Sequence, residues 1–265
     1  MAGRTFHCGF QTNVFGRPPL PRDVWRRALN VISAYGYEGV ECHFRQIELL
    51  GLDAILSDLK TYNLRLAAVH YGMRLYDPAL FRDEEENIRR IASACKRLNC
   101  GYIVLSGGKP RGESFTDVDV KRKADQLSHL GETALNYGVK ICYHNHGWEA
   151  AGSPSHLERL RDLTDPRTVS FCLDVGNISQ GGRDPVAAAR RLASRMEMLH
   201  VKDFGSGGFT EIGEGEIDFP LIFDILSEVG FDGWLIVERE RTNLTPEESV
   251  RRATEYLRRH IRCGE

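Results

Sequence analysis

The stretch GYIVLSGG (residues 101–108) decides the fold class, because its apolar residues follow one another without alternation. A strand with one face in water alternates apolar and polar residues, whereas a strand buried on both faces is a continuous apolar run. The segment GWLIVERE (233–240) shows the same pattern at residues 235–237. Strands buried on both faces are typical of parallel sheets that are covered by helices.

Outward from this stretch, strand-like runs alternate with longer amphipathic segments along the whole chain. The predicted strands are 6–12, 39–44, 64–72, 101–108, 139–146, 169–177, 196–204 and 233–240. The predicted helices are 22–36, 52–63, 83–98, 117–137, 155–164, 184–194, 219–229 and 246–260. Eight such units predict an α/β fold, a closed (β/α)8 or TIM barrel, as a single domain over residues 1–265. An open doubly wound sheet is the alternative, but no G-x-G-x-x-G follows the first strand.

The composition is that of an ordinary globular protein, with 265 residues, 42% of them hydrophobic and 27% charged. A net charge of −2 provides no field for nucleic acid or an anionic membrane, so we expect neither as a partner. The N-terminus lacks the apolar stretch of a signal peptide. The seven cysteines include no C-x-x-C pair, which favours a reducing, cytoplasmic setting without disulfides. The basic run 251–262 is expected to be a solvated helix face that leaves room for a homo-oligomer contact.

Polar residues follow the predicted strands, at the end of a barrel where active sites lie. These residues are Gln11, Glu41, His43, His70, Tyr71, His144, Asn145, His146, Asp174, Asn177, His200, Lys202, Asp203, Glu238 and Glu240. The barrel brings five histidines to one mouth together with several carboxylates. A divalent cation would offset the repulsion between buried carboxylates. Mixed imidazole and carboxylate ligands suit Mn²⁺, Zn²⁺, Co²⁺ or Fe²⁺.

Five motifs resemble the xylose isomerase-like superfamily of sugar phosphate isomerases and epimerases, which includes inosose dehydratase and ketose epimerases. They are YHNHGWE (143–149), CLDVGN (172–177), LHVKDF (199–204), GEGEIDFP (213–220) and VERE (237–240). The resemblance implies one metal ion held by Glu, Asp, His and Glu from strands five to eight. Asp174, His200 and Glu238 match the last three positions, and His144 stands where many members have Glu. We expect His144 to be the fourth ligand; the alternatives are Glu149 in that place or no ligand from the fifth strand.

The resemblance also implies a carbohydrate or polyol substrate that carries a carbonyl group, with Mn²⁺ as the first metal to expect. The main prediction is an isomerase or epimerase, in which a base removes the proton next to the carbonyl and the metal stabilises the enediolate. His146 and Glu149 are the expected proton carriers. Glu41, His70 and Lys202 are the expected substrate contacts.

The first alternative is a metal-dependent dehydratase, or β-eliminating lyase, that acts on a keto-sugar or inosose. Replacement of Glu by His144 removes a negative charge from the site, which makes the metal a stronger Lewis acid and favours this alternative. A phosphodiesterase like the endonuclease-four type of DNA repair enzyme would need a basic groove, which the near-neutral charge does not favour. The last alternative is a barrel that binds sugar without catalysis. Its only support is that His144 stands where many members of the family have Glu.

Overall fold

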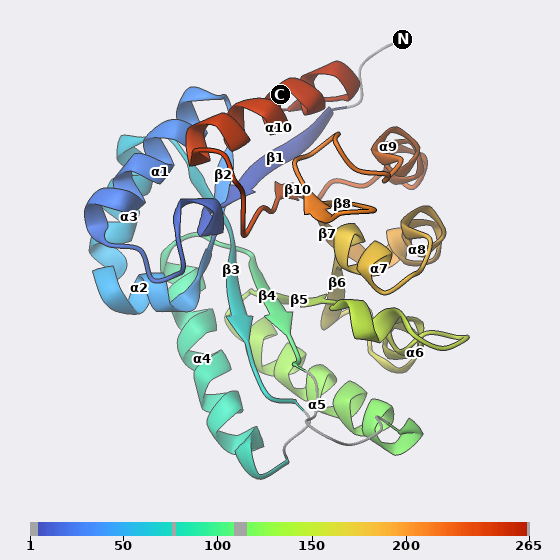
Figure 1. Cartoon of the computed structure of the whole chain (residues 1–265). Coiled ribbons are helices and arrows are strands. Elements are labelled where there is room, and N and C mark those ends of the chain that lie inside the picture. Colours follow the sequence, from blue (N-terminus) through green and yellow to red (C-terminus); the bar gives the residue numbers. More distant parts are fainter. Residues whose placement is uncertain (1–4, 76–77, 109–115, 264–265) are drawn as a thin grey trace.

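A closed parallel barrel forms the centre of the molecule in the computed structural model, which describes residues 5–75, 78–108 and 116–263 (Figure 1). Each strand pairs with its neighbours in chain order, and the last pairs with the first through His7 and Trp234 at one end and Phe10 and Val237 at the other. This closure confirms the predicted barrel. The strands are β1 (Thr5–Gln11), β2 (Gly39–His43), β3 (Arg65–Gly72), β4 (Tyr102–Ser106), β5 (Lys140–His144), β6 (Val169–Asp174), β7 (Met196–Val201) and β10 (Trp234–Val237).

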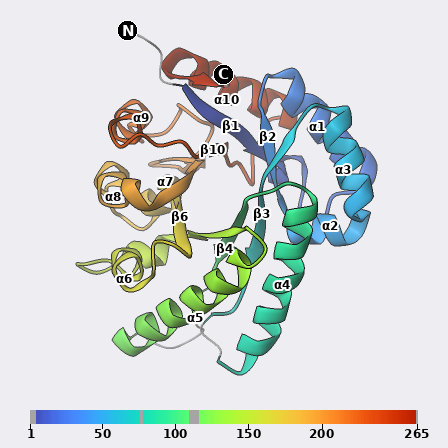
Figure 2. The same cartoon turned by 180° about the vertical axis from the view of Figure 1, so that it is seen from behind.

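Helices surround the barrel on its outside, as the views from the two sides show (Figures 1 and 2). They are α1 (Arg22–Ala34), α2 (Phe44–Leu50), α3 (Leu52–Thr61), α4 (Phe81–Arg97), α5 (Asp117–Leu135), α6 (His156–Leu163), α7 (Val175–Gln180), α8 (Pro185–Leu192), α9 (Phe219–Glu228) and α10 (Pro246–His260). Among the described residues, none of the helices has the length and apolar character needed to cross a membrane.

Two short helices, α2 and α7, begin where the sequence predicts the end of a strand. His43 accepts a hydrogen bond from the backbone N–H of Arg45, and this cap starts α2 at Phe44. Asp174 caps α7 in the same way, through the backbone N–H of Asn177. The second and sixth strands are therefore shorter than predicted. The seventh is also shorter, because residues 203–205 form a small hairpin, β8 (Asp203–Gly205) with β9 (Gly208–Thr210).

The core consists of two layers, one inside the barrel and one between the barrel and its helices. In β4, Val104 belongs to the inner layer, whereas Ile103 and Leu105 belong to the outer layer. Both faces of the strand are therefore buried, which explains why its apolar residues do not alternate. The inner layer contains Ala67, Ala68, Val104, Cys142, Cys172, Met198, Trp234 and Ile236.

A disulfide joins Cys8 to Cys263, so the prediction of a chain without disulfides is wrong for this pair. The last described strand, β11 (Arg262–Cys263), pairs with the first residues of β1 and brings the two Cα atoms within 5.3 Å. The pairing spans 255 residues, and sequence spacing does not predict it. Five cysteines are free and buried, as expected for core-filling residues: Cys42, Cys95, Cys100, Cys142 and Cys172.

Candidate metal centre

A polar cavity of about 320 Å³ opens at the carboxyl ends of the barrel strands. Its position agrees with the rule that TIM-barrel sites are built from the residues that follow the strands. The lining residues come from almost every part of the mouth: Gln11, Asn13, His43, His70, His144, His146, Asn177, Gln180, Lys202, Phe209, Glu238 and Glu240.

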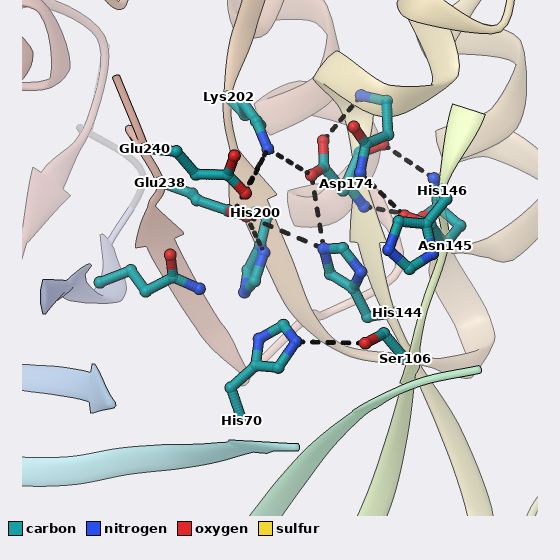
Figure 3. A network of polar contacts seen from close by, with 12 residues as sticks. His70, Ser106, His144, Asn145, His146, Asp174, His200, Lys202, Glu238 and Glu240 are labelled. Atoms are coloured by element: carbon teal, nitrogen blue, oxygen red, sulfur yellow. Dashed lines mark hydrogen bonds and ion pairs between the residues drawn. The ribbon is translucent and has the colours of Figure 1, made fainter. Parts of the chain in front are cut away.

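Four side chains from four neighbouring strands meet at the floor of this cavity (Figure 3). They belong to His144, Asp174, His200 and Glu238, and one potential ligand atom of each lies within 4.8 Å of the others. His144 Nε2 is 3.4 Å from Asp174 Oδ2 and 3.8 Å from Glu238 Oε2. All four residues are buried. The structure thus brings together the four residues that the motifs indicate, in an arrangement able to hold one divalent ion.

The donor atoms of this cluster meet the requirements of a metal site. Asp174 Oδ2, Glu238 Oε2, His144 Nε2 and His200 Nδ1 are buried and have no hydrogen-bond partner among the described residues. His200 Nδ1 lies 2.5 Å from Glu238 Oε2, but the two groups are not aligned as a hydrogen bond. Unsatisfied buried carboxylates are costly, and a cation at their centre would satisfy them. Two imidazoles and two carboxylates are a donor set for Mn²⁺, Zn²⁺, Co²⁺ or Fe²⁺.

Glu41 orients His200 from below the cavity. Its Oε2 lies 2.9 Å from His200 Nε2, and its Oε1 accepts from Gln11 Nε2 at 2.6 Å and lies 3.1 Å from His70 Nδ1. A proton on His200 Nε2, held by Glu41, leaves Nδ1 free to face the cluster, and carboxylates commonly orient metal-bound histidines in this way. Burial opposes the charged carboxylate, but the two histidines hold the pKa of Glu41 well below its usual range. Glu41 is fully buried and does not line the cavity, and the contact with substrate that the sequence predicts for it stays a prediction.

Asn145 fixes the position of Asp174, a role that the sequence did not reveal. Its amide oxygen accepts from the backbone N–H of Asp174 at 2.9 Å, and its amide nitrogen donates to the Asp174 carbonyl at 3.1 Å. Asn177 donates its backbone N–H to Asp174 Oδ1 and its side-chain amide to the Asn145 carbonyl. These bonds leave Asp174 Oδ2 directed at the cluster. In the sequence, the only sign of this contact is that Asn145 and Asp174 lie near the ends of neighbouring predicted strands.

Lys202 lies at the edge of the cluster and lines the cavity. Its ammonium is 3.2 Å from Glu238 Oε1, 3.5 Å from Asp174 Oδ2 and 3.6 Å from Glu240 Oε1 (Figure 3). Burial disfavours the charged amine, but these three carboxylates raise the pKa of Lys202. The lysine is therefore a fixed positive charge beside the floor of the cavity, where the sequence places a substrate contact.

His70 and His146 also line the cavity, on either side of His144 in Figure 3. Their ring centroids lie 5.3 and 5.5 Å from that of His144. His70 Nε2 is 3.4 Å from the Ser106 hydroxyl, and burial lowers the pKa of His70. The side chain of His146 is 40% exposed, so it can reach a molecule in the cavity. Both histidines lie where the sequence predicts them.

Glu149, the expected proton carrier and alternative ligand, lies away from the cluster. It is fully buried and absent from the cavity lining. Its Oε1 accepts from Lys123 Nζ at 2.7 Å and from the Tyr143 hydroxyl at 2.6 Å, and its Oε2 accepts from the backbone N–H of His146 at 2.9 Å. Burial opposes its charge, but Lys123 above all lowers the pKa of Glu149 to about 2. A carboxylate with three donors has no access to a substrate.

The chain matches a family model described as xylose isomerase-like TIM barrel over residues 29–260. An inosose dehydratase of Mesomycoplasma hyopneumoniae (strain 7448) is 29% identical to it over 280 residues, which cover 91% of this chain and 90% of the relative. A sugar phosphate isomerase/epimerase from Parabacteroides distasonis has the same fold, with a TM-score of 0.79, 24% identity and coverage of 97% and 94% of the two chains. An IOLI protein solved with a bound zinc atom gives a TM-score of 0.80, with 18% identity and coverage of 97% and 98%. The predicted resemblance is confirmed, and the chain belongs to the xylose isomerase-like TIM barrel family.

Proposed function

We propose that this protein is a metal-dependent dehydratase that removes water from a keto-polyol of the inosose type. The observation that carries the proposal is the four-residue cluster at the floor of a polar cavity that also holds His146 and Lys202. A relative that covers nine-tenths of the chain is named inosose dehydratase, which supports dehydration over the isomerisation that the sequence first suggested. A cavity lined by imidazole, amide and carboxylate groups suits a substrate that carries many hydroxyls.

His144, Asp174, His200 and Glu238 would hold the metal ion, and Mn²⁺ is our first choice among the four ions that suit this donor set. When bound, the ion supplies Lewis acidity that stabilises negative charge on the substrate carbonyl oxygen. Lys202 adds a positive charge at the same edge of the cavity.

The reaction breaks the C–H bond next to the carbonyl and the C–O bond of the hydroxyl on the following carbon. In our proposal, His146 accepts the proton and returns it to the departing hydroxyl, so that one water leaves and no proton is gained or lost overall. The product carries a carbon–carbon double bond conjugated with the carbonyl, and the hydroxyl that stays on the carbon that lost its proton makes this product the enol form of a 1,2-diketone. His70 holds a substrate hydroxyl through the Nε2 that faces Ser106.

Isomerisation or epimerisation is the second candidate, and the presence of two cavity histidines beside His144 favours it. Epimerisation returns a proton to the opposite face of the same carbon, which needs a proton carrier on each side. His70 and His146 occupy separate positions at the mouth, with His144 between them (Figure 3). In this reaction the product keeps the mass of the substrate.

Incubation of the purified protein with inosose and other keto-polyols, after loading with Mn²⁺, Co²⁺ or Zn²⁺, tests the proposal. We expect a product that has lost one water by mass spectrometry and absorbs in the ultraviolet as an unsaturated ketone. A new product of unchanged mass would establish the second candidate instead. Full activity of metal-loaded Glu238→Ala would contradict both, because each uses the cluster.

A further inference from the structure

An ion pair lies buried beside the candidate site, where the proposed reaction does not use it. Lys123 is 2% exposed and Glu149 is fully buried, and their charged atoms are 2.7 Å apart. The Lys123 ammonium also lies over the rings of Tyr143 and Trp148, at 4.7 and 5.1 Å from their centroids. Buried ion pairs rarely add net stability, because desolvation costs about as much as the attraction provides. A role in positioning gives a reason to keep such a pair.

The geometry points to His146 as the group that this ion pair positions. We propose that Glu149, clamped by Lys123 and Tyr143, is a positioning residue that holds the His146 imidazole at the mouth of the cavity. Glu149 Oε2 accepts the backbone N–H of His146 at 2.9 Å and lies 3.7 Å from His146 Nδ1. The carboxylate therefore faces one ring nitrogen and leaves the other directed away from it. This inference rests on the proposed function of His146.

The clamp is rigid because each partner comes from a different, well-packed element. Lys123 lies on α5, Tyr143 on β5, and Glu149 on the short helical turn Gly147–Ala150 that follows. Gly107 follows the neighbouring strand β4 and packs closely against Lys123 and Tyr143. A Cβ built on it would lie 2.8 Å from Lys123 Cε and 2.8 Å from the Tyr143 hydroxyl. The carboxylate cannot move without the displacement of at least one of these partners.

Glu149→Gln tests the proposal, because it keeps the shape of the side chain and removes the charge. In the metal-loaded enzyme we expect kcat to fall about 10–100-fold, as small misplacements of a catalytic group do. The KM for the keto-polyol should change little, and the metal content should equal that of the wild type, because the cluster is untouched. Tyr143→Phe removes one bond to Glu149 and should lower kcat to a smaller extent. It serves as the second variant if Glu149→Gln does not fold.

Glu158→Gln is the matched control. Glu158 has the same place in a capping box as Glu149, with its Oε2 accepting the backbone N–H of Ser155 at 2.7 Å. It caps α6 and is absent from the cavity lining. We expect Glu158→Gln to leave kcat unchanged, which separates positioning from the general effect of a lost cap.

A double-mutant cycle with His146→Ala shows whether Glu149 acts through His146. We expect Glu149→Gln to have no further effect on kcat when His146 is already Ala, because its target is absent. Equal losses in both backgrounds, or a wild-type kcat for Glu149→Gln, would overturn the positioning role. A wild-type kcat for His146→Ala would instead refute the base of the proposed function, so the two failures are distinguishable.

Discussion

Replacement of Cys263 by Ser should lower stability substantially, because the Cys8–Cys263 disulfide closes almost the whole chain into a loop. The two cysteines are separated by 255 residues. In the chain-entropy model, closure of a loop of that length corresponds to about 5.5 kcal/mol at 25 °C. Measured effects of disulfides fall below this limit, so we expect a loss of about 3 kcal/mol. At a urea dependence of about 3 kcal/mol per M, the unfolding midpoint moves down by about 1 M.

Urea unfolding followed by fluorescence, with and without dithiothreitol, measures this effect. Reductant should lower the midpoint of the wild type to that of Cys263→Ser and leave the variant unchanged, since the five free cysteines are present in both. Thiol titration in urea without reductant should give five reactive thiols in the wild type, from seven cysteines. Seven reactive thiols in the wild type, or an unfolding midpoint that does not change with reductant, would refute the reasoning.

Three further outcomes follow from the surroundings of the site. The pKa of Glu149 is lowered from 4.5 to about 2, so protonation of its carboxylate destabilises the fold, and the contribution of the charge is present above pH 4.5 and is lost as the pH falls toward 2. The gap in urea midpoint between wild type and Glu149→Gln should therefore narrow below pH 4.5, and a gap constant from pH 7 to pH 3.5 contradicts this. Gly107→Ala should cost about 1–3 kcal/mol in thermal or urea unfolding, because the methyl group displaces Lys123, and an unchanged midpoint shows that the site can relax. Asn145→Ala frees the backbone of Asp174 and should weaken Mn²⁺ binding in a metal titration about 10–100-fold, whereas wild-type affinity excludes an orienting role.

The barrel and the cluster could be predicted from the sequence because local signals carry both. The continuous apolar run at 101–108 reflects burial on both faces of β4, which only a covered parallel sheet provides. His144 and Asp174 are the last residues of their strands, His200 is the last but one of its strand, and Glu238 follows its strand directly, so the fold brings all four to one mouth. These features depend on residues that are close in sequence, so the sequence pattern predicts them.

Contacts between residues far apart in sequence could not be predicted. Glu149 looked like a reactive group because it follows two histidines closely, but its partner Lys123 lies 26 residues earlier on α5. Nothing in the spacing shows which way a carboxylate turns at a strand end. The position of Glu41 also depends on a distant contact, since its partner His200 is 159 residues away in sequence. For Cys8 and Cys263, the pairing depends on where the end of the chain docks against β1.

Closure of the barrel by β1 and β10 has a consequence for folding during synthesis on the ribosome. β1 is made before the other strands of the barrel, but its partner strand β10, which begins at Trp234, follows more than two hundred residues later. Until then β1 has an unpaired edge, which is open to wrong partners and to chaperones. All four residues of the cluster belong to the later part of the chain, whereas Gln11, Glu41 and His70 belong to its beginning. The Glu41–His200 contact joins a strand of the first half of the barrel to one of the second half, so a correctly oriented His200 indicates that the two halves of the barrel have come together.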